Sequence, residues 1–419
     1  MMNIMTNFKI AFIFLVAVFA INLEANPVFA RQYDMACSAC HSQVPALNDM
    51  GLGFVRNGFR TSKYDTTALQ SFIDSNSSKR FYPVGAIVGL SDNSKSDDVN
   101  RLVKLYLSGT VTDSLSVYSS TKENFNSNKS DQELFESGNS QFYFQYNILE
   151  AKHVFRAGLL SPWTQLGNIK RSMGHSGLHG GEGHGDNYFS PLQHANVKKI
   201  KGAEYSYLFD NNVLLLFSYG ESVDNSRSYG KDSSYGKGSS DGNTTQDDNN
   251  AFLAGITYTT SSYYKIGLVY NYIGMENNNN QNPNAQGNQG NQNPNAQGNQ
   301  GNQGNQGNQG NQGDVQYSLI LPIEKEYSSF TWNSSLVYVN YSNDDYIGIE
   351  NAFTFPLGDM EHIKAIFNAD SDENDDTNFG YSLGYTKIYN MFYFSAVAAR
   401  VNTDTYNSNK FMGTINLIF

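Results

Sequence analysis

Apolar and polar side chains alternate along most of this chain with a period of two residues. In the segment 138–149, Phe142, Phe144 and Tyr146 fall on one side and Gln145 on the other. This period places successive side chains on opposite faces of an extended strand. The pattern predicts about 16 strands, at 81–91, 100–111, 114–122, 138–149, 152–160, 197–209, 212–221, 250–260, 263–274, 313–323, 327–341, 345–357, 361–370, 377–387, 390–402 and 408–419.

The connections between these strands alternate between short and long. The short ones are 112–113, 150–151, 210–211, 261–262, 324–326, 358–360 and 388–389, and the long ones are 92–99, 123–137, 161–196, 222–249, 275–312, 371–376 and 403–407. Outer-membrane barrels have short periplasmic turns and longer outside loops. A soluble β-sandwich, the alternative, has no reason to sort its loops in this way. The fold class predicted for 81–419 is therefore all-β, a transmembrane antiparallel β-barrel with every long connection outside.

Composition supports this prediction. Aromatic residues make up 14% of the chain and charged residues only 16%, while mean hydropathy is −0.48. Aromatic girdles around a polar lumen give this combination. The net charge of −11 argues against a nucleic-acid partner; it either attracts cations or simply keeps copies of the protein apart. The Asn/Gln/Gly repeats within 275–313 predict a flexible surface loop.

Both ends of the chain carry targeting features. Lys9, the apolar run 10–21 and the small residue Ala30 predict a signal peptide over 1–30. The alternative is a membrane anchor, but the run is shorter than the roughly 20 apolar residues that span a bilayer as a helix. The last strand alternates and ends on Phe419, as do the strands by which bacterial outer-membrane barrels are recognised for insertion. An ordinary closing strand is the alternative there.

The motif Cys37-Ser38-Ala39-Cys40-His41 carries the clearest chemistry. It uses both cysteines of the chain. Its spacing lets two thiols bond to the haem vinyl groups while the adjacent imidazole reaches the iron. The alternatives are a thioredoxin-like redox pair, which would need a βαβ context, and half of a zinc site. We predict one covalent haem c, held by Cys37 and Cys40 as thioethers and by His41 as proximal ligand.

The haem segment is predicted to span 31–80. Few residues separate the motif from the first strand, too few for a cytochrome with its own core. The barrel lumen must then form part of the haem's wall, in a plug-like arrangement. The sixth iron ligand stays open: Met50 is one candidate, although it could equally contact the haem edge, and a lumenal His or Met or an open position are the others.

The long connection 161–196 is rich in histidine, with carboxylates among its glycines. Imidazoles and carboxylates are common ligands of divalent transition metals. We therefore consider a weak collecting site for iron or another cation near the pore mouth, against the alternative of a flexible loop that happens to contain histidines. The candidate ligands are His175, His179, His184 and His194.

A signal peptide, one Cys-x-x-Cys-His site and a barrel of about sixteen strands resemble the fused outer-membrane cytochrome–porins of iron-oxidising bacteria. The run Tyr33–Arg60 looks like that family's haem segment, through Pro45, Ala46, Leu47, Asn48, Gly51, Phe54, Asn57, Gly58 and Arg60. The barrel matches only in pattern. The resemblance implies a haem in or under the pore that takes electrons from extracellular ferrous iron and passes them to a periplasmic c-type cytochrome or another carrier.

These expectations define an outer-membrane protein, embedded in lipid, with its haem segment on the periplasmic side or within the lumen. It would act as an iron(II) oxidoreductase by outer-sphere electron transfer. One alternative is the same conduit serving reduced sulfur, an electrode or a partner cell. Another is a solute porin whose haem is structural or sensory.

Overall fold

The structure is a computed structural model of the whole chain. It describes residues 28–33, 35–43, 46–61, 83–93, 96–125, 140–149, 151–161, 166, 192, 195, 197, 199–223, 249–260, 264–274, 315–341, 344–372, 377–389, 392–402 and 407–418. Within these residues, no helix has the length and apolar content needed to cross a bilayer.

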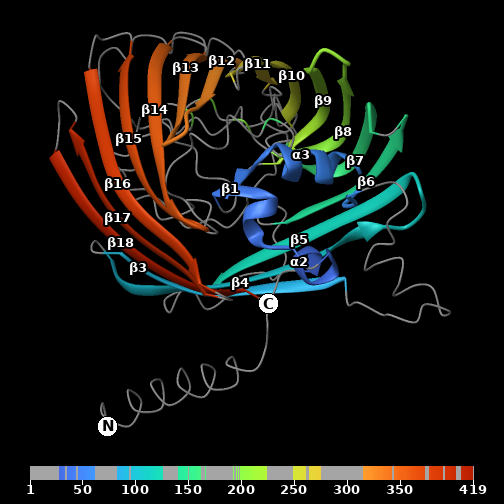
Figure 1. Cartoon of the computed structure of the whole chain (residues 1–419). Coiled ribbons are helices and arrows are strands. Elements are labelled where there is room, and N and C mark those ends of the chain that lie inside the picture. Colours follow the sequence, from blue (N-terminus) through green and yellow to red (C-terminus); the bar gives the residue numbers. More distant parts are fainter. Residues whose placement is uncertain are drawn as a thin grey trace, which may run out of the picture.

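Sixteen strands form one closed antiparallel barrel, seen as the curved wall in Figure 1. They are β3 (Val84–Asn93), β4 (Ser96–Thr110), β5 (Leu115–Phe125), β6 (Gln141–Ile148), β7 (His153–Leu160), β8 (Lys199–Leu208), β9 (Val213–Val223), β10 (Asn249–Thr259), β11 (Tyr264–Gly274), β12 (Val315–Glu326), β13 (Thr331–Tyr341), β14 (Asp344–Gly358), β15 (Glu361–Asp372), β16 (Thr377–Tyr389), β17 (Phe392–Asn402) and β18 (Asn407–Ile418). Each strand pairs with the next in sequence, and β18 closes the ring on β3. The predicted fold class is confirmed.

Predicted strand bounds differ from the observed ones by at most four residues. The largest differences lie at the start of β4 and at the β12–β13 turn, which falls at 327–330 instead of 324–326. The predicted turn consisted of the charged residues 324–326. Glu324 instead faces inward and binds Lys265, while the Lys325 ammonium lies 3.7 Å from the centre of the Tyr264 ring, so the strand continues. The turn then closes through a hydrogen bond from Tyr327 N to Phe330 O of 2.9 Å.

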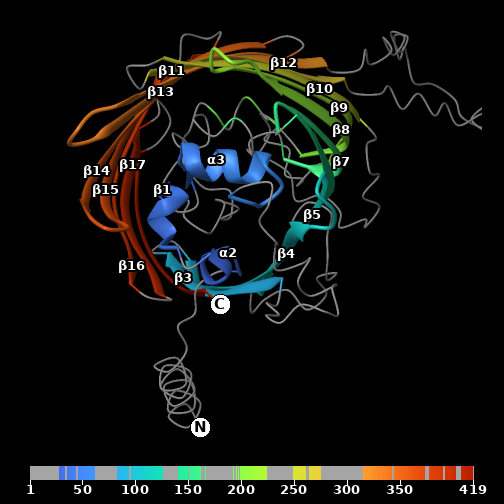
Figure 2. The same cartoon turned by 45° about the vertical axis from the view of Figure 1, so that its right-hand side comes forward.

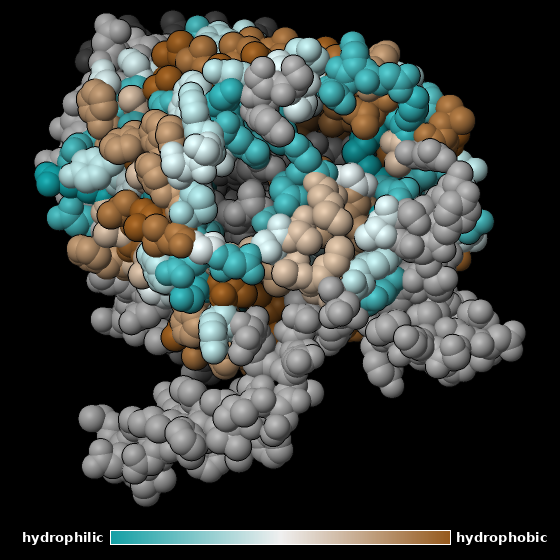
Figure 3. Space-filling model, in the orientation of Figure 1, coloured by the Kyte–Doolittle hydropathy of each residue, from teal (hydrophilic) through white to brown (hydrophobic). Residues whose placement is uncertain are grey.

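The barrel is apolar outside and largely polar inside. Along β6, Phe142, Phe144 and Tyr146 are 45–49% exposed, whereas the intervening Tyr143 and Gln145 are buried. Hydrophilic side chains line much of the visible interior, and hydrophobic groups lie along the outer rim (Figure 3). A soluble protein would expose the polar face; a membrane barrel exposes the apolar one to lipid.

The N-terminal segment lies inside this ring (Figures 1 and 2). It comprises helix α2 (Val28–Tyr33), the 3₁₀ turn η1 (Cys37–Ala39), the paired strands β1 (His41–Gln43) and β2 (Ala46–Leu47), and helix α3 (Asp49–Arg56). Phe29 of α2 packs on Phe54 and Phe59. Cleavage after Ala30 would remove that ring from the mature protein.

Candidate functional site

Asn48 ties the Cys-x-x-Cys-His turn to helix α3. Its side-chain Nδ2 donates to the backbone carbonyls of Ser38 and Ala39, at 3.2 and 3.0 Å, and its backbone N–H donates to Cys40 O at 3.0 Å. The Oδ1 atom accepts from Gly51 N at 2.9 Å and so caps the helix N-terminus. One side chain therefore fixes both the motif and the start of α3.

Gly51 lets the helix lie directly on the motif. A Cβ atom at this position would stand 2.1 Å from Cys40 O and 3.0 Å from Leu47 Cδ2. Any larger residue would push the helix away from the turn that carries the second cysteine. Gly53 lies two residues further along α3, and a Cβ atom there would have nothing within 4 Å. The requirement for glycine is thus specific to Gly51.

The two cysteines form no disulfide with each other, and both are partly buried. Burial raises the pKa of both Cys37 and Cys40. A thioredoxin-like pair needs a lowered thiol pKa to react as a thiolate, so this environment does not favour redox exchange. In the described part of the chain, no set of three or more His, Cys, Asp and Glu side chains is arranged as metal ligands, which gives the zinc alternative no further ligand.

His41 begins β1, directly after the second cysteine, and its Nδ1 atom is buried. A ligating histidine turns one ring nitrogen to the metal and the other into the protein. Nε2 is therefore the nitrogen suited to the proximal face of a haem. With both thiols on the preceding turn, the residues present fit covalent haem attachment.

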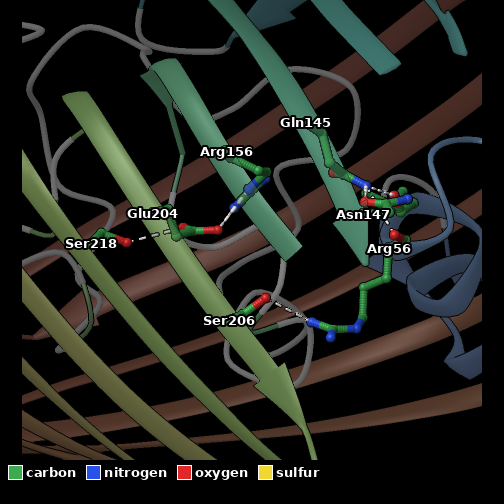
Figure 4. A network of polar contacts seen from close by, with 8 residues as sticks. Arg56, Gln145, Asn147, Arg156, Glu204, Ser206 and Ser218 are labelled. Atoms are coloured by element: carbon green, nitrogen blue, oxygen red, sulfur yellow. Dashed lines mark hydrogen bonds and ion pairs between the residues drawn. The ribbon is translucent and has the colours of Figure 1, made fainter. Parts of the chain in front are cut away.

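The far end of α3 is anchored to the barrel wall. The guanidinium of Arg56 donates to Ser206 Oγ at 2.9 Å (Figure 4). It also donates to the carbonyls of Ala151 and Lys152, at 2.9 and 3.3 Å. Gln145 Nε2 donates to Val55 O and Arg56 O, each at 2.9 Å. The last carbonyls of a helix lack partners within the helix, so a strand side chain caps α3 from the wall.

Further contacts hold the residues after α3. Gly58 adopts a φ of 73° and turns the chain back, and its carbonyl accepts from Thr110 Oγ1 at 2.6 Å. Arg60 Nη2 donates to Asp113 O at 2.6 Å. Lys152 and Asp113 lie in the short β6–β7 and β4–β5 turns. The segment is thus docked at the end of the barrel that carries the short turns.

Apolar contacts accompany these hydrogen bonds. Phe54 and Phe59 form a buried cluster with Tyr143 and Leu160 of the wall. Phe59 stacks on Tyr118 at 5.8 Å between ring centres, and Tyr118 stacks on Tyr143 at 5.2 Å. Burying side chains of this size contributes about 1.5–3 kcal/mol each. The segment is therefore packed against the wall as part of the fold.

A charged pair lies beside this cluster. Arg156 and Glu204 are fully buried and bonded to each other, with Arg156 Nε 2.6 Å from Glu204 Oε1 (Figure 4). Ser218 Oγ donates to the second carboxylate oxygen at 3.0 Å. Burial and the charge of Arg156 lower the pKa of Arg56 to about 10, so Arg56 keeps its charge at neutral pH.

The remaining predicted site residues fare differently. Met50 lies in the first turn of α3 with 46% of its surface exposed, and its role as distal ligand stays a prediction. The four loop histidines, His175, His179, His184 and His194, lie outside the described residues. The roles of Asn48, Arg56 and Gln145 were not predicted individually. Asn48 followed by Asp49 is an N-cap signal that could have located the start of α3.

The connection between β7 and β8 does not lie wholly outside the barrel, as the loop pattern predicted. Leu166, Leu192 and Ala195 are buried against lumen-facing apolar residues of β8 to β14, among them Leu253 and Ile320. The Ala195 carbonyl accepts from Asn271 Nδ2 at 3.1 Å and from Ser318 Oγ at 3.0 Å. The physical reason is that this part of the lumen is apolar and buries the leucines.

Neither a protein-family model nor a curated protein sequence matches this chain. Among solved structures, an anion-selective porin from Comamonas acidovorans aligns with a TM-score of 0.52 and 10% identity, over 80% of this chain and 98% of that one. This chain has the fold of an outer-membrane porin. OmpF of Salmonella typhi, in complex with daunomycin, aligns with a TM-score of 0.50 and 8% identity, over 80% and 96% of the chains. Sequence identities this low establish the fold alone. They say nothing about the role of the N-terminal segment.

Proposed function

We propose that this protein is an outer-membrane monohaem cytochrome–porin. It takes electrons from an extracellular donor, ferrous iron in the first instance, and passes them to a periplasmic c-type cytochrome or another carrier. The observation that carries the proposal is the docking of the Cys-x-x-Cys-His segment within a porin-type barrel. Arg56, Gln145 and a buried aromatic cluster hold this segment against the barrel wall, which supports a role for it in the function of the barrel.

The chain's own residues set the conditions for electron transfer. When bound, the haem would supply a one-electron iron couple. Cys37 and Cys40 would hold it covalently and His41 Nε2 would bind its iron. Asn48 and Gly51 keep these three residues on the end of α3, and Arg56 keeps α3 in the lumen. Outer-sphere transfer needs this fixed placement more than it needs acid–base chemistry.

Topology supports the direction of transfer. The predicted signal peptide exports the N-terminus, and the short turns of outer-membrane barrels face the periplasm. The docked segment contacts the β4–β5 and β6–β7 turns, which supports a position on the periplasmic side. A periplasmic carrier would then approach the site directly, while the donor would act from the loop side.

The decisive experiment mixes anaerobic ferrous iron with the oxidised, detergent-purified protein and follows the haem absorption band. We expect reduction by iron, and haem that stays attached after heating in denaturant. The Cys37→Ala/Cys40→Ala variant is the control and should carry no covalent pigment. A protein that contains covalent haem but is not reduced by ferrous iron would remove iron as the donor. Reduction by sulfide or by a poised electrode would then favour the conduit for another donor.

A solute porin is the second candidate, because the solved structures that align with this chain include an anion-selective porin. Among the described residues, however, two segments occupy the lumen: the N-terminal segment at the short-turn end and residues of the β7–β8 connection at the other. We therefore expect small conductance in planar bilayers. Large, steady conductance together with a haem that does not react with any donor would support the solute porin.

A further inference from the structure

The chain contains 7 histidines, and three of them lie in the described residues: His41, His153 and His362. His41 belongs to the attachment motif. His153 begins β7 on its outward face, where Nδ1 lies 2.9 Å from Tyr205 Oη. His362 is different, because it is 5% exposed and shares the inward face of β15 with the buried Lys364. It is thus the one lumenal histidine of the described strands.

His362 lies at the end of the barrel where the N-terminal segment is docked. It follows the short β14–β15 turn, which ends at Met360. The cysteine motif precedes α3, whose C-terminal Arg56 contacts β8 and the β6–β7 turn. At the other end of the helix, Asp49 pairs with Lys265 of β11. The motif therefore lies away from β6–β8, and Figure 2 shows β1 on the side of the ring that carries β14 to β17.

The charge of the β14–β15 turn also acts on the cysteine motif. Burial raises the pKa of Cys37, and the carboxylate of Asp359 in the β14–β15 turn raises it further. Asp359 is three residues before His362. The first cysteine therefore lies within electrostatic range of the β14–β15 turn.

The immediate surroundings of His362 suit a ligand. Its Nε2 atom contacts Thr386 Oγ1 on the neighbouring strand. Within the described residues, this is the one hydrogen bond recorded for the ring, so Nδ1 remains for another partner. A second-shell hydrogen bond to one ring nitrogen orients the imidazole and fixes which nitrogen binds metal. Strand placement also holds the ring more rigidly than a loop would.

We propose that His362 is the distal axial ligand of the haem that Cys37, Cys40 and His41 attach. The inference rests on the proposed function. The proximal ligand would come from the docked segment and the distal one from the barrel wall. Six-coordinate iron would then form only when the segment is in place, so docking and haem ligation are linked. Met50, exposed on α3, is the competing ligand.

The test uses full-length protein purified from outer membranes, with the haem's optical and electron-paramagnetic-resonance spectra as readouts. We expect low-spin, six-coordinate haem that binds carbon monoxide slowly when reduced. His362→Ala should lose the low-spin signal and bind carbon monoxide rapidly, and added imidazole should restore the low-spin spectrum. His153→Ala is the matched control, a strand histidine at the same end of the barrel that faces outward, and should leave the spectrum unchanged.

His362→Met covers the case in which the alanine variant fails to fold, because it keeps side-chain volume and a ligand atom. Methionine ligation raises the reduction potential of haem relative to histidine, so this variant should stay six-coordinate at a higher potential. An unchanged spectrum and potential in the His362 variants would overturn the proposal, as would a wild-type haem that is high-spin. A wild-type protein without covalent pigment would overturn the proposed function as well. Covalent haem that ferrous iron reduces, with unaltered His362 variants, would overturn this ligand alone.

Discussion

Two glycines of α3 give opposite predictions for the same substitution. Alanine at Gly53 meets nothing within 4 Å, whereas alanine at Gly51 would place Cβ 2.1 Å from Cys40 O. Replacing glycine by alanine inside a helix stabilises it by about 0.8–1.0 kcal/mol. Gly53→Ala should therefore be neutral or stabilising.

For Gly51→Ala, the helix gain is opposed by overpacking, which typically costs about 1–3 kcal/mol. The contacted atoms include a backbone carbonyl that Asn48 also uses, so relaxation requires α3 and the motif to separate. After subtraction of the helix gain, we expect the docking of the motif to lose up to about 2 kcal/mol.

The assay compares the two variants for covalent haem per barrel and for the thermal transition of the haem absorption band. Gly51→Ala should lower the yield or the transition temperature, and Gly53→Ala should match the wild type or exceed it. Equal behaviour of the two variants would refute the close packing of α3 on the Cys40 turn.

Two further predictions follow from the contacts of α3, and a third concerns the loop histidines. Asn48→Ala should destabilise the motif by about 2–4 kcal/mol, since it removes a helix cap and two hydrogen bonds; a transition temperature like that of Asn57→Ala would contradict this. Arg56→Ala removes three hydrogen bonds from a charged donor, each worth at most about 1.5–3 kcal/mol. The variant should make the N-terminal segment accessible to protease and raise the conductance in bilayers. Replacing the exposed Arg400 by alanine is the control and should change neither property. Replacing all four loop histidines by alanine should weaken metal binding and iron-dependent haem reduction; unchanged values would show that the histidines do not collect metal.

The barrel was predictable because its signals are local. Alternation along β6 reports which side chains meet lipid, and the length of each connection reports which end of the barrel it joins. The charged run Glu324–Glu326 misled because its partners, Lys265 and Tyr264, come from another strand. Tertiary contacts of this kind override local turn preference.

The site was only partly predictable, for a similar reason. The spacing of Cys37, Cys40 and His41 is the one that covalent haem attachment requires, so a single pentapeptide suffices for the prediction. Gln145 capping α3 joins residues 90 apart in sequence, and no local pattern announces such a pair. The buried leucines of the β7–β8 connection were not predicted. The alternation of short and long connections shows at which end of the barrel a connection starts and ends, but not the path that it takes in between.

The pairing of β18 with β3 restricts the order of biogenesis. The first and last barrel strands can pair only after β18 has been synthesised, so the ring stays open until late in folding. If the N-terminal segment carries the proposed haem, the group would be attached most simply before that closure. The anchor points of α3, Ser206 and the β6–β7 turn, lie later in the sequence than α3, so the helix can dock only once those strands are in place.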